Sequence, residues 1–357
     1  MMTPEKHFYI ERPNGTRRPS HCTIYVDGTA GEDFREGIDI ELSHWIPNRT
    51  EDRYKAGTST EICFKFLKAN KNHSYDLVIN NHMDMDGLLS VFVLAYPMIA
   101  LQHRDTLCDA AKAGDFWAWS TDKALKIFQE VTCMYQDLGR QKIDLQKRYE
   151  ICFEKILEIL EGSDDKTDAQ SILESQNGLV EQGKIQRYEL TQRFVAYFVP
   201  KELSHDRIEE LLGVPKFNAP LSARLAFWPQ VRNRLDAEKI QLVAIETDNG
   251  IHYDLWYPAY AWADTKGLWR PPGLGLPEKA GGFQKLDWPA LSKVFQELNR
   301  LEAGACEWQL FSGIRFAGQE NARGFPIVAS TLGKNNEKKE SYFPLNTVTC
   351  YFKSLFK

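Results

Sequence analysis

Tyr75-Asp-Leu-Val-Ile-Asn-Asn-His-Met-Asp-Met-Asp-Gly-Leu-Leu-Ser90 is the stretch from which the fold prediction starts. Its apolar part, Leu77–Asn80, predicts a buried strand, and the apolar run Leu88–Tyr96 predicts a helix. The loop between them carries polar side chains at alternate positions: His82, Asp84 and Asp86. Two carboxylates and an imidazole this close repel one another, or compete for water, unless a cation lies between them. Because oxygen and nitrogen donors suit Mn, Mg, Fe and Zn, the stretch predicts a divalent-metal site.

The flanking sequence predicts a parallel sheet around this loop. Residues 23–28 have the pattern of a second strand, ending at Asp27, and Thr58-Ser-Thr-Glu61 is typical of a helix start. Strands that alternate with helices favour an α/β fold with a doubly wound, Rossmann-like parallel sheet. Ligands bind such sheets at the carboxyl ends of the strands, where Asp27 and the His82 loop both lie. We therefore expect residues 1–120 to form an α/β metal-site domain, with residues 1–20 as an extended lead-in.

The rest of the chain divides into two further parts. Residues 124–138 and 145–160 each carry apolar side chains every three or four positions, which predicts two amphipathic helices. We interpret 121–186 as a helical insertion and leave open whether it is a lid or a dimer arm. Residues 187–357 predict a smaller α+β C-terminal domain, in which Asp248-Asn-Gly250 indicates a hairpin because Asn-Gly tolerates positive φ.

Composition narrows the classes of partner. The net charge of -5 and the pI near 6.0 give no general attraction to long nucleic acids. Seven scattered cysteines without a Cys-x-x-Cys pair indicate neither a zinc ribbon nor a disulfide framework.

The chain shows no signal-peptide pattern and no apolar stretch of about 20 residues, so we expect a cytoplasmic protein without a membrane partner. A homodimer is left open. No Walker loop and no Gly-x-Gly-x-x-Gly is present, so neither ATP nor NAD is implied.

The block His82-x-Asp84-x-Asp86-Gly87-x-x-Ser90 resembles the first motif of the DHH phosphoesterase superfamily. The resemblance covers this motif and its strand-loop-helix context. It implies that His82, Asp84 and Asp86 are catalytic and bind a divalent metal, with Mn preferred and Mg, Fe or Zn as alternatives. It also implies metal-activated water as the nucleophile and, from the superfamily's second motif, an aspartate at a strand end. Ala113-Gly-Asp-Phe116 offers Asp115 for that position.

The sequence also departs from the superfamily's pattern. No two histidines are adjacent, so the Asp-His-His motif is missing, and so is the glycine-rich histidine motif of the C-terminal domain. The missing motifs are compatible with a site for one ion. They are also compatible with a site for two ions whose remaining ligands come from other parts of the chain. His44, in a polar loop, and Asp27, at the end of a neighbouring strand, are the candidates to complete the ligand set. Their simpler interpretations are a hydrogen-bonded loop imidazole and a turn-forming Asp-Gly.

Over most of its length the chain is similar to a bacterial family without an assigned activity. The shared blocks are Leu42-Ser-His-Trp45, Asn80-Asn-His-x-Asp-x-Asp-Gly87 and Ala113-Gly-Asp-Phe116. This resemblance groups His44, Asp115 and the three residues of the first motif without naming a reaction.

The resulting hypothesis is a metal-dependent hydrolase of a phosphate ester or phosphodiester. The acidic pI favours a small nucleotide or another small phosphorylated compound as substrate. Arg49 and Arg53 are candidates for binding its phosphate, because arginine suits oxyanions, and Asn81 is a candidate for contacting the ligands or the substrate. The alternative is a catalytically reduced DHH-like module that senses a ligand or regulates a partner.

Overall fold

The computed structural model describes the following residues: 4–10, 20–28, 30–70, 74–163, 166–203, 227–265, 267–275, 285–286, 288–302, 306–310, 325–334 and 339–357. They belong to two compact units. The described part of unit 1 lies in Met1–Thr167 and in the distant segment Trp262–Gly267, and unit 2 comprises the described remainder. The architecture is mixed α/β, with a parallel sheet in unit 1 and a mixed sheet in unit 2.

The sheet of unit 1 consists of β1 (His7–Ile10), β2 (Thr23–Val26), β3 (Ile40–Leu42) and β4 (Leu77–Asn80). The strands lie in the order β1-β4-β2-β3, and every neighbouring pair is parallel, as predicted. All residues of β2 and β4 are buried, which explains their unbroken apolar character. Within the extended lead-in predicted for residues 1–20, His7–Ile10 pair with the sheet as a strand, which the sequence did not indicate. This edge strand buries only its last residue fully, so its pattern is too weak to read from the sequence.

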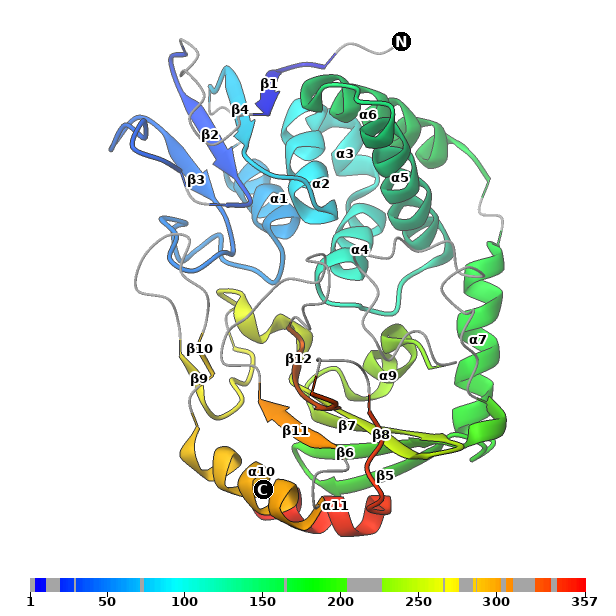
Figure 1. The fold of residues 1–357 in the computed structure, drawn as a ribbon. Coiled ribbons are helices and arrows are strands. Elements are labelled where there is room, and N and C mark those ends of the chain that lie inside the picture. The colour runs from blue at the N-terminus through cyan, green and yellow to red at the C-terminus, as the bar shows by residue number, and fades with distance from the viewer. Residues whose placement is uncertain are drawn as a thin grey trace. The chain divides into compact units, whose positions relative to one another are not determined.

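Six helices complete the described part of unit 1: α1 (Ser59–Ala69), α2 (Met85–Ala95), α3 (Pro97–Gln102), α4 (Arg104–Asp115), α5 (Asp122–Arg140) and α6 (Leu145–Glu161). The short helix η4 (Ala259–Trp262) contributes only its last residue to this unit. The apolar helix α2 packs against β4, β2 and β1, with α1 and α4 beside it, and α6 contacts β1 (Figure 1). The amphipathic pattern over 124–160 correctly predicted α5 and α6. Helix α2 begins at Met85 rather than Leu88, so Asp86 lies in the first turn of the helix and not in the loop.

Unit 2 is built on a six-stranded sheet in the order β11-β12-β8-β7-β6-β5, in which only β6 and β7 pair parallel. Its strands are β5 (Gln186–Thr191), β6 (Phe194–Val199), β7 (Ile240–Thr247), β8 (Gly250–Trp256), β11 (Glu307–Leu310) and β12 (Ile327–Leu332). The predicted hairpin is present between β7 and β8. The remaining elements are α7 (Asp168–Glu181), η1 (Lys201–Leu203), α9 (Pro229–Asp236), α10 (Pro289–Glu302), α11 (Leu345–Lys353) and the small β9–β10 pair (Leu274–Gly275, Lys285–Leu286).

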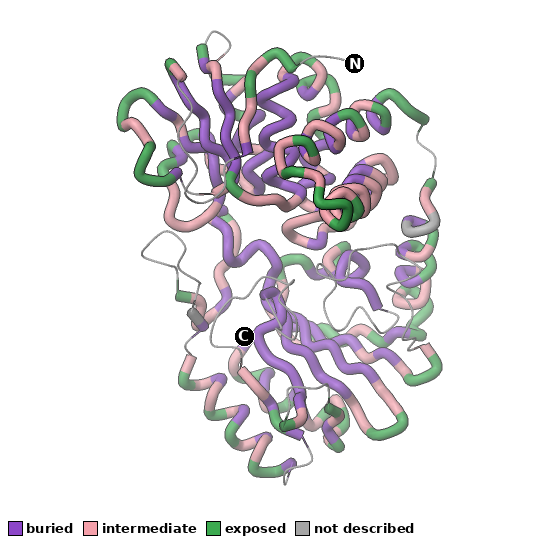
Figure 2. The backbone as a smooth tube through the Cα atoms, turned by 45° about the horizontal axis from the view of Figure 1, so that its top comes forward, coloured by how far each residue is buried: buried purple, intermediate pink, exposed green. Residues whose placement is uncertain are grey.

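Each unit has its own buried core. Strands β2 and β4, helix α2 and strand β12 are buried along their whole length, and Figure 2 shows buried segments of the backbone in purple. Within the described residues, every helix is too short or too polar to cross a bilayer.

Candidate metal centre

Three parallel strands deliver the candidate residues to one edge of the sheet in unit 1. Val26 of β2 stands opposite Leu42 of β3, and Tyr25 stands opposite Ile79 of β4, so the three chains leave the sheet at the same level. Asp27 follows β2, His44 follows β3, and the His82 loop follows β4. The carboxyl edge of a parallel sheet therefore gathers residues that are up to 55 positions apart in the sequence.

Asp27 occupies the centre of the cluster and is completely buried. Its φ of 45° lies in the left-handed region, which is uncommon for a side chain other than glycine and which aspartate tolerates better than most. Its Oδ1 atom accepts hydrogen bonds from Ser59 Oγ at 2.9 Å and from Trp45 Nε1 at 3.1 Å. Strained backbone of this kind concentrates at functional sites, because the surrounding structure must hold it in place.

Helix α1 fixes the carboxylate of Asp86. The backbone N–H groups of Ser59 and Thr60, in the first turn of α1, donate to Asp86 at 2.6 and 2.8 Å. The predicted helix start at Thr58 is confirmed as a capping box, in which the Thr58 and Glu61 side chains each accept from the other's backbone N–H. The fully buried Asp86 is thus held by the positive end of a helix dipole.

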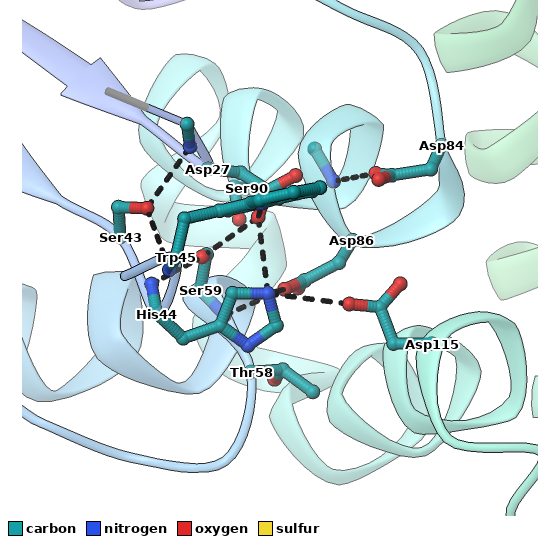
Figure 3. Close-up of polar contacts among 12 residues, drawn as sticks. Asp27, Ser43, His44, Trp45, Thr58, Ser59, Asp84, Asp86, Ser90 and Asp115 are labelled. Carbon is teal, nitrogen blue, oxygen red and sulfur yellow. Dashed lines mark hydrogen bonds and ion pairs between the residues drawn. The ribbon is translucent and has the colours of Figure 1, made fainter. Parts of the chain in front are cut away.

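The ring of His44 is anchored so that one nitrogen faces three carboxylates. Its Nδ1 donates to the carbonyl oxygen of Gly57 at 2.7 Å, which leaves Nε2 as the lone-pair nitrogen of a neutral ring. Nε2 lies at similar distances from three carboxylate oxygens: Asp27 Oδ1 at 3.3 Å, Asp115 Oδ2 at 3.3 Å and Asp86 Oδ2 at 3.5 Å (Figure 3). A lone pair surrounded by carboxylate oxygens is repulsive unless a cation, either a proton or a metal ion, occupies the space between them.

His82 repeats this arrangement on the other side of Asp27. Its Nδ1 lies 2.8 Å from Asn81 Oδ1, and its Nε2 lies 3.0 Å from Asp84 Oδ2 and 3.2 Å from Asp27 Oδ2. The side chains of His82 and Asp84 are 32% and 34% exposed, whereas His44, Asp27 and Asp86 are buried. Asp84 also caps α2, because its Oδ1 accepts from Gly87 N at 2.8 Å. Capping of α2 uses Asp84 Oδ1, and Oδ2 is the oxygen that faces His82 and could bind a metal ion.

Two groups of metal-type ligands emerge, and they share Asp27. The buried group consists of Asp27, His44 and Asp86, and the open group consists of Asp27, His82 and Asp84; within each, one donor atom per residue lies within 4.8 Å of the others. Three buried atoms at the junction lack a hydrogen-bond partner among the described residues: Asp27 Oδ2, His44 Nε2 and Asp115 Oδ2. Unsatisfied nitrogen and carboxylate donors that converge in this way fit a divalent cation in each group.

The pKa shifts follow from burial and crowding. Burial, reinforced by the charge of Asp27, raises the pKa of Asp86 to about 7. Burial and the charge of Asp84 likewise raise the pKa of Asp115 well above its ordinary value. At Asp27 burial acts in the same direction, but the imidazoles of His44 and His82, which lie 3.3 and 3.2 Å from its oxygens, outweigh burial and lower the pKa. At both histidines burial favours the neutral ring, yet the surrounding carboxylates outweigh it and raise the pKa.

Aromatic residues enclose the histidines. The Trp262 ring lies 4.8 Å from both His44 and Trp45, and Trp45 lies edge-on to His82 at 5.5 Å. The neighbouring Asp264 N donates to the backbone oxygen of His44 at 2.7 Å. Sequence reasoning missed Ser59, Trp45 and the 262–264 segment as parts of the site. Their contacts are long-range, and no local pattern marks them.

The structure places the other predicted residues as follows. Asp115 joins the cluster, but it is the last residue of helix α4 and does not lie at a strand end. This part of the prediction was wrong because it assumed the superfamily's arrangement. Asn81 contacts His82. The two arginines make ion pairs with glutamates outside the cluster: within the described structure, Arg49 pairs with Glu36 and Glu41, and Arg53 pairs with Glu51.

The chain belongs to the family of unknown function DUF6687, whose profile matches residues 9–190. The matched range includes all six residues of the cluster. No curated protein matches the chain.

Proposed function

We propose that unit 1 binds two divalent ions and hydrolyses a phosphate ester or phosphodiester of a small nucleotide or another small phosphorylated compound. The observation that supports this most strongly is the position of His44 Nε2, which lies 3.3–3.5 Å from oxygens of three buried carboxylates without a hydrogen bond to any of them. The mirrored group at His82, with Asp27 common to both, supports two ions rather than one.

The donor set favours Mn. Carboxylates suit Mg and Mn, imidazoles suit Zn and Fe, and a mixed set in each group suits Mn best, with Mg, Fe and Zn as alternatives. A pair of such ions supplies activation of a water nucleophile and neutralisation of the charge that develops on a phosphoryl group. Asp27, His44, Asp86 and Asp115 would hold the buried ion, and Asp27, His82 and Asp84 would hold the open one.

The protein holds the buried ligand group rigidly and leaves the open ligand group accessible to solvent. Asp86 and His44 are fixed by backbone groups at Ser59, Thr60 and Gly57, so the buried group changes little when it is loaded. The exposed sides of His82 and Asp84 provide the approach for water and substrate. Asn81 would orient His82. Arg49 and Arg53 remain candidates for the substrate phosphate, since their side chains are 47% and 62% exposed and their contacts with Glu36 and Glu51 are weak surface ion pairs.

The finer architecture is part of the same proposal. Residues 1–120 would form a doubly wound metal-site domain, 121–186 a helical insertion, of which α7 belongs to unit 2, and 187–357 a smaller C-terminal domain. The chain lacks the Asp-His-His motif of the superfamily. Asp27 and His44, at the ends of β2 and β3, would supply ligands in its place.

Activity tests should compare the protein with two ligand variants. Metal-stripped protein is reloaded with Mn and assayed on a chromogenic phosphodiester and on small nucleotides, beside Asp84→Asn, Asp86→Asn and the exposed-surface control Asp137→Asn. We expect a rate in the wild type and the control, and a loss of about 100-fold or more in the ligand variants. Equal rates in all four proteins would refute hydrolysis at this site. Stabilisation by a nucleotide without metal and without turnover would instead favour the sensing module.

A further inference from the structure

Arg232 of unit 2 carries a buried guanidinium that forms no ion pair with the described acids. It lies in α9 and is completely buried. Its guanidinium stacks on the ring of Trp256 at 4.1 Å and lies 5.7 Å from the ring of Phe227. Its Nη1 donates to Gln241 Oε1 at 2.8 Å. Two aromatic faces and a neutral amide orient the guanidinium but supply no counter-charge.

The remaining donors of Arg232 lie along one edge of the guanidinium. Nε and Nη2 have no hydrogen-bond partner in the described structure, and neither does the buried Nε1 of Trp256. The N–H groups on Nε and Nη2 point in parallel, which is the geometry that arginine uses to bind both oxygens of a carboxylate or two oxygens of a phosphate. The unsatisfied edge is therefore the one suited to a two-point oxyanion contact.

The nearby acids are committed elsewhere. Asp236, on the same helix, accepts from Arg187 Nε and Nη2 at 2.7 Å each and from the Tyr197 hydroxyl. Asp254 accepts from Ser330 and lies 3.2 Å from His252 Nε2. Among the described acids, none forms an ion pair with Arg232.

The charge on Arg232 persists at neutral pH. Burial lowers the pKa of Arg232 to about 9, although the neighbouring Tyr197 and Asp254 act in the opposite direction. The guanidinium therefore stays cationic at pH 7, and a buried cation without a bonded anion is strongly disfavoured. Buried charges in folded proteins are normally paired or bind a ligand.

We propose that Arg232 forms an oxyanion-binding site in unit 2, which takes the phosphate or carboxylate group of a small ligand through Nε and Nη2. The indole of Trp256 orients the guanidinium, and its N–H adds a further donor beside it. This site is built from residues of unit 2 alone and is independent of the metal centre and of the proposed hydrolysis.

The test is anion binding by the full-length protein in EDTA, so that no metal ion contributes. Three proteins are compared: the wild type, Arg232→Met and the control Arg300→Met. Each is titrated calorimetrically with inorganic phosphate and with acetate, and its thermal unfolding is measured with the same two anions. Chloride keeps the ionic strength constant. Arg300 is an exposed arginine of the same unit. We expect phosphate or acetate to bind the wild type and the control, and to bind Arg232→Met at least about tenfold more weakly. Binding of phosphate alone would identify a phosphate ligand, and equal binding of acetate a carboxylate ligand.

Two results would overturn the proposal: neither anion binds the wild type at about 10 mM, or Arg232→Met binds as well as the wild type. If Arg232→Met does not fold, Arg232→Lys serves in its place, because lysine keeps the charge and loses the two-point edge. A second measurement follows the binding by NMR in wild-type protein labelled with ¹⁵N-arginine. Phosphate or acetate should shift one slowly exchanging Nε–H resonance, which is assigned to Arg232 by its absence from the spectrum of Arg232→Lys. A spectrum that neither anion shifts would also contradict the site.

Discussion

Gly87 lies where the ligand groups leave no room for a side chain. It lies in the first turn of α2, and a Cβ atom there would lie 2.2 Å from Asn80 Nδ2, 2.8 Å from Asp27 Oδ2 and 3.1 Å from Asp84 Oδ1. Asn80 cannot move away freely, because its Oδ1 accepts from the backbone N–H of His82. The glycine is required by space and not by backbone conformation.

We therefore predict that Gly87→Ala destabilises the protein and weakens metal binding. Alanine normally stabilises a helix by about 1 kcal/mol relative to glycine, so a loss of stability would report the clash with Asn80 and Asp27. The matched control is Gly178→Ala in α7, where the nearest atom to the new Cβ is Gln182 Nε2 at 3.8 Å. Urea unfolding should show Gly178→Ala as neutral or stabilised; equal stabilisation of Gly87→Ala would contradict the packing described at the cluster.

At the scale of elements, the N-terminus of α1 and the ends of three parallel strands build the centre together. The strand ends bring Asp27, His44 and the His82 loop to one edge, and α1 donates two backbone N–H groups to Asp86. Because Thr58 caps this helix, it controls the position of those donors. The cap of α1 is thus coupled to the metal centre, whereas the caps of distant helices are not.

This coupling predicts different behaviour for two helix-cap variants. Thr58→Ala and Asp144→Ala each remove a side-chain cap, from α1 and α6 respectively, and each should cost about 0.5–2 kcal/mol of stability. Only Thr58→Ala should also weaken Mn binding, by up to about tenfold, because α1 donates directly to the Asp86 carboxylate, whereas α6 contacts only the backbone oxygen of His82, through Tyr149. Calorimetric Mn titrations of both variants check this, and equal Mn affinities would show that α1 does not position Asp86.

The sequence was most informative where the determining pattern was local. The apolar residues of Leu77–Asn80 and the run after Gly87 predicted β4 and α2, and the alternation of His82, Asp84 and Asp86 singled out their loop. The parallel sheet followed from the alternation of strands and helices, and it placed Asp27 near that loop. These inferences needed only periodicity and the known geometry of parallel sheets.

The rest of the centre depends on contacts that no local pattern encodes. Asp115 reaches His44 from the end of a helix, and Trp262 packs on His44 from a segment more than 200 residues away in the chain. Arg49 and Arg53 pair with neighbouring glutamates in the structure, and their assignment to the substrate phosphate stays a prediction. Long-range packing decided the positions of Asp115 and Trp262.

At the scale of the whole molecule, the cluster makes the stability of the metal-free protein depend on pH. The pKa of Asp86 rises from 3.8 to about 7 on folding, so the folded protein binds more protons than the unfolded chain between those values. Its stability therefore falls as the pH rises through that range. The raised pKa values of Asp115, His44 and His82 act in the same direction, and the lowered pKa of Asp27 acts only below 3.8.

We accordingly predict that the melting temperature of the metal-free protein falls from pH 5 to pH 8. Metal binding requires deprotonated ligands, so stabilisation by saturating Mn should grow over the same range. Thermal scans in EDTA and in Mn, at matched ionic strength, measure both trends. A metal-free profile that stays level, or an identical fall in the presence of Mn, would show that the cluster does not control stability in this range.

Binding of two ions that share Asp27 is tested most directly by the metal content of the protein after Mn loading and desalting, measured beside Asp27→Asn and the surface control Asp137→Asn. Because Asp27 belongs to both ligand groups, we expect about two Mn per chain in the wild type and the control, and loss of both ions in Asp27→Asn. If the wild-type protein retains no metal, the cluster is not a metal centre, and protons, not metal ions, hold the buried carboxylates together.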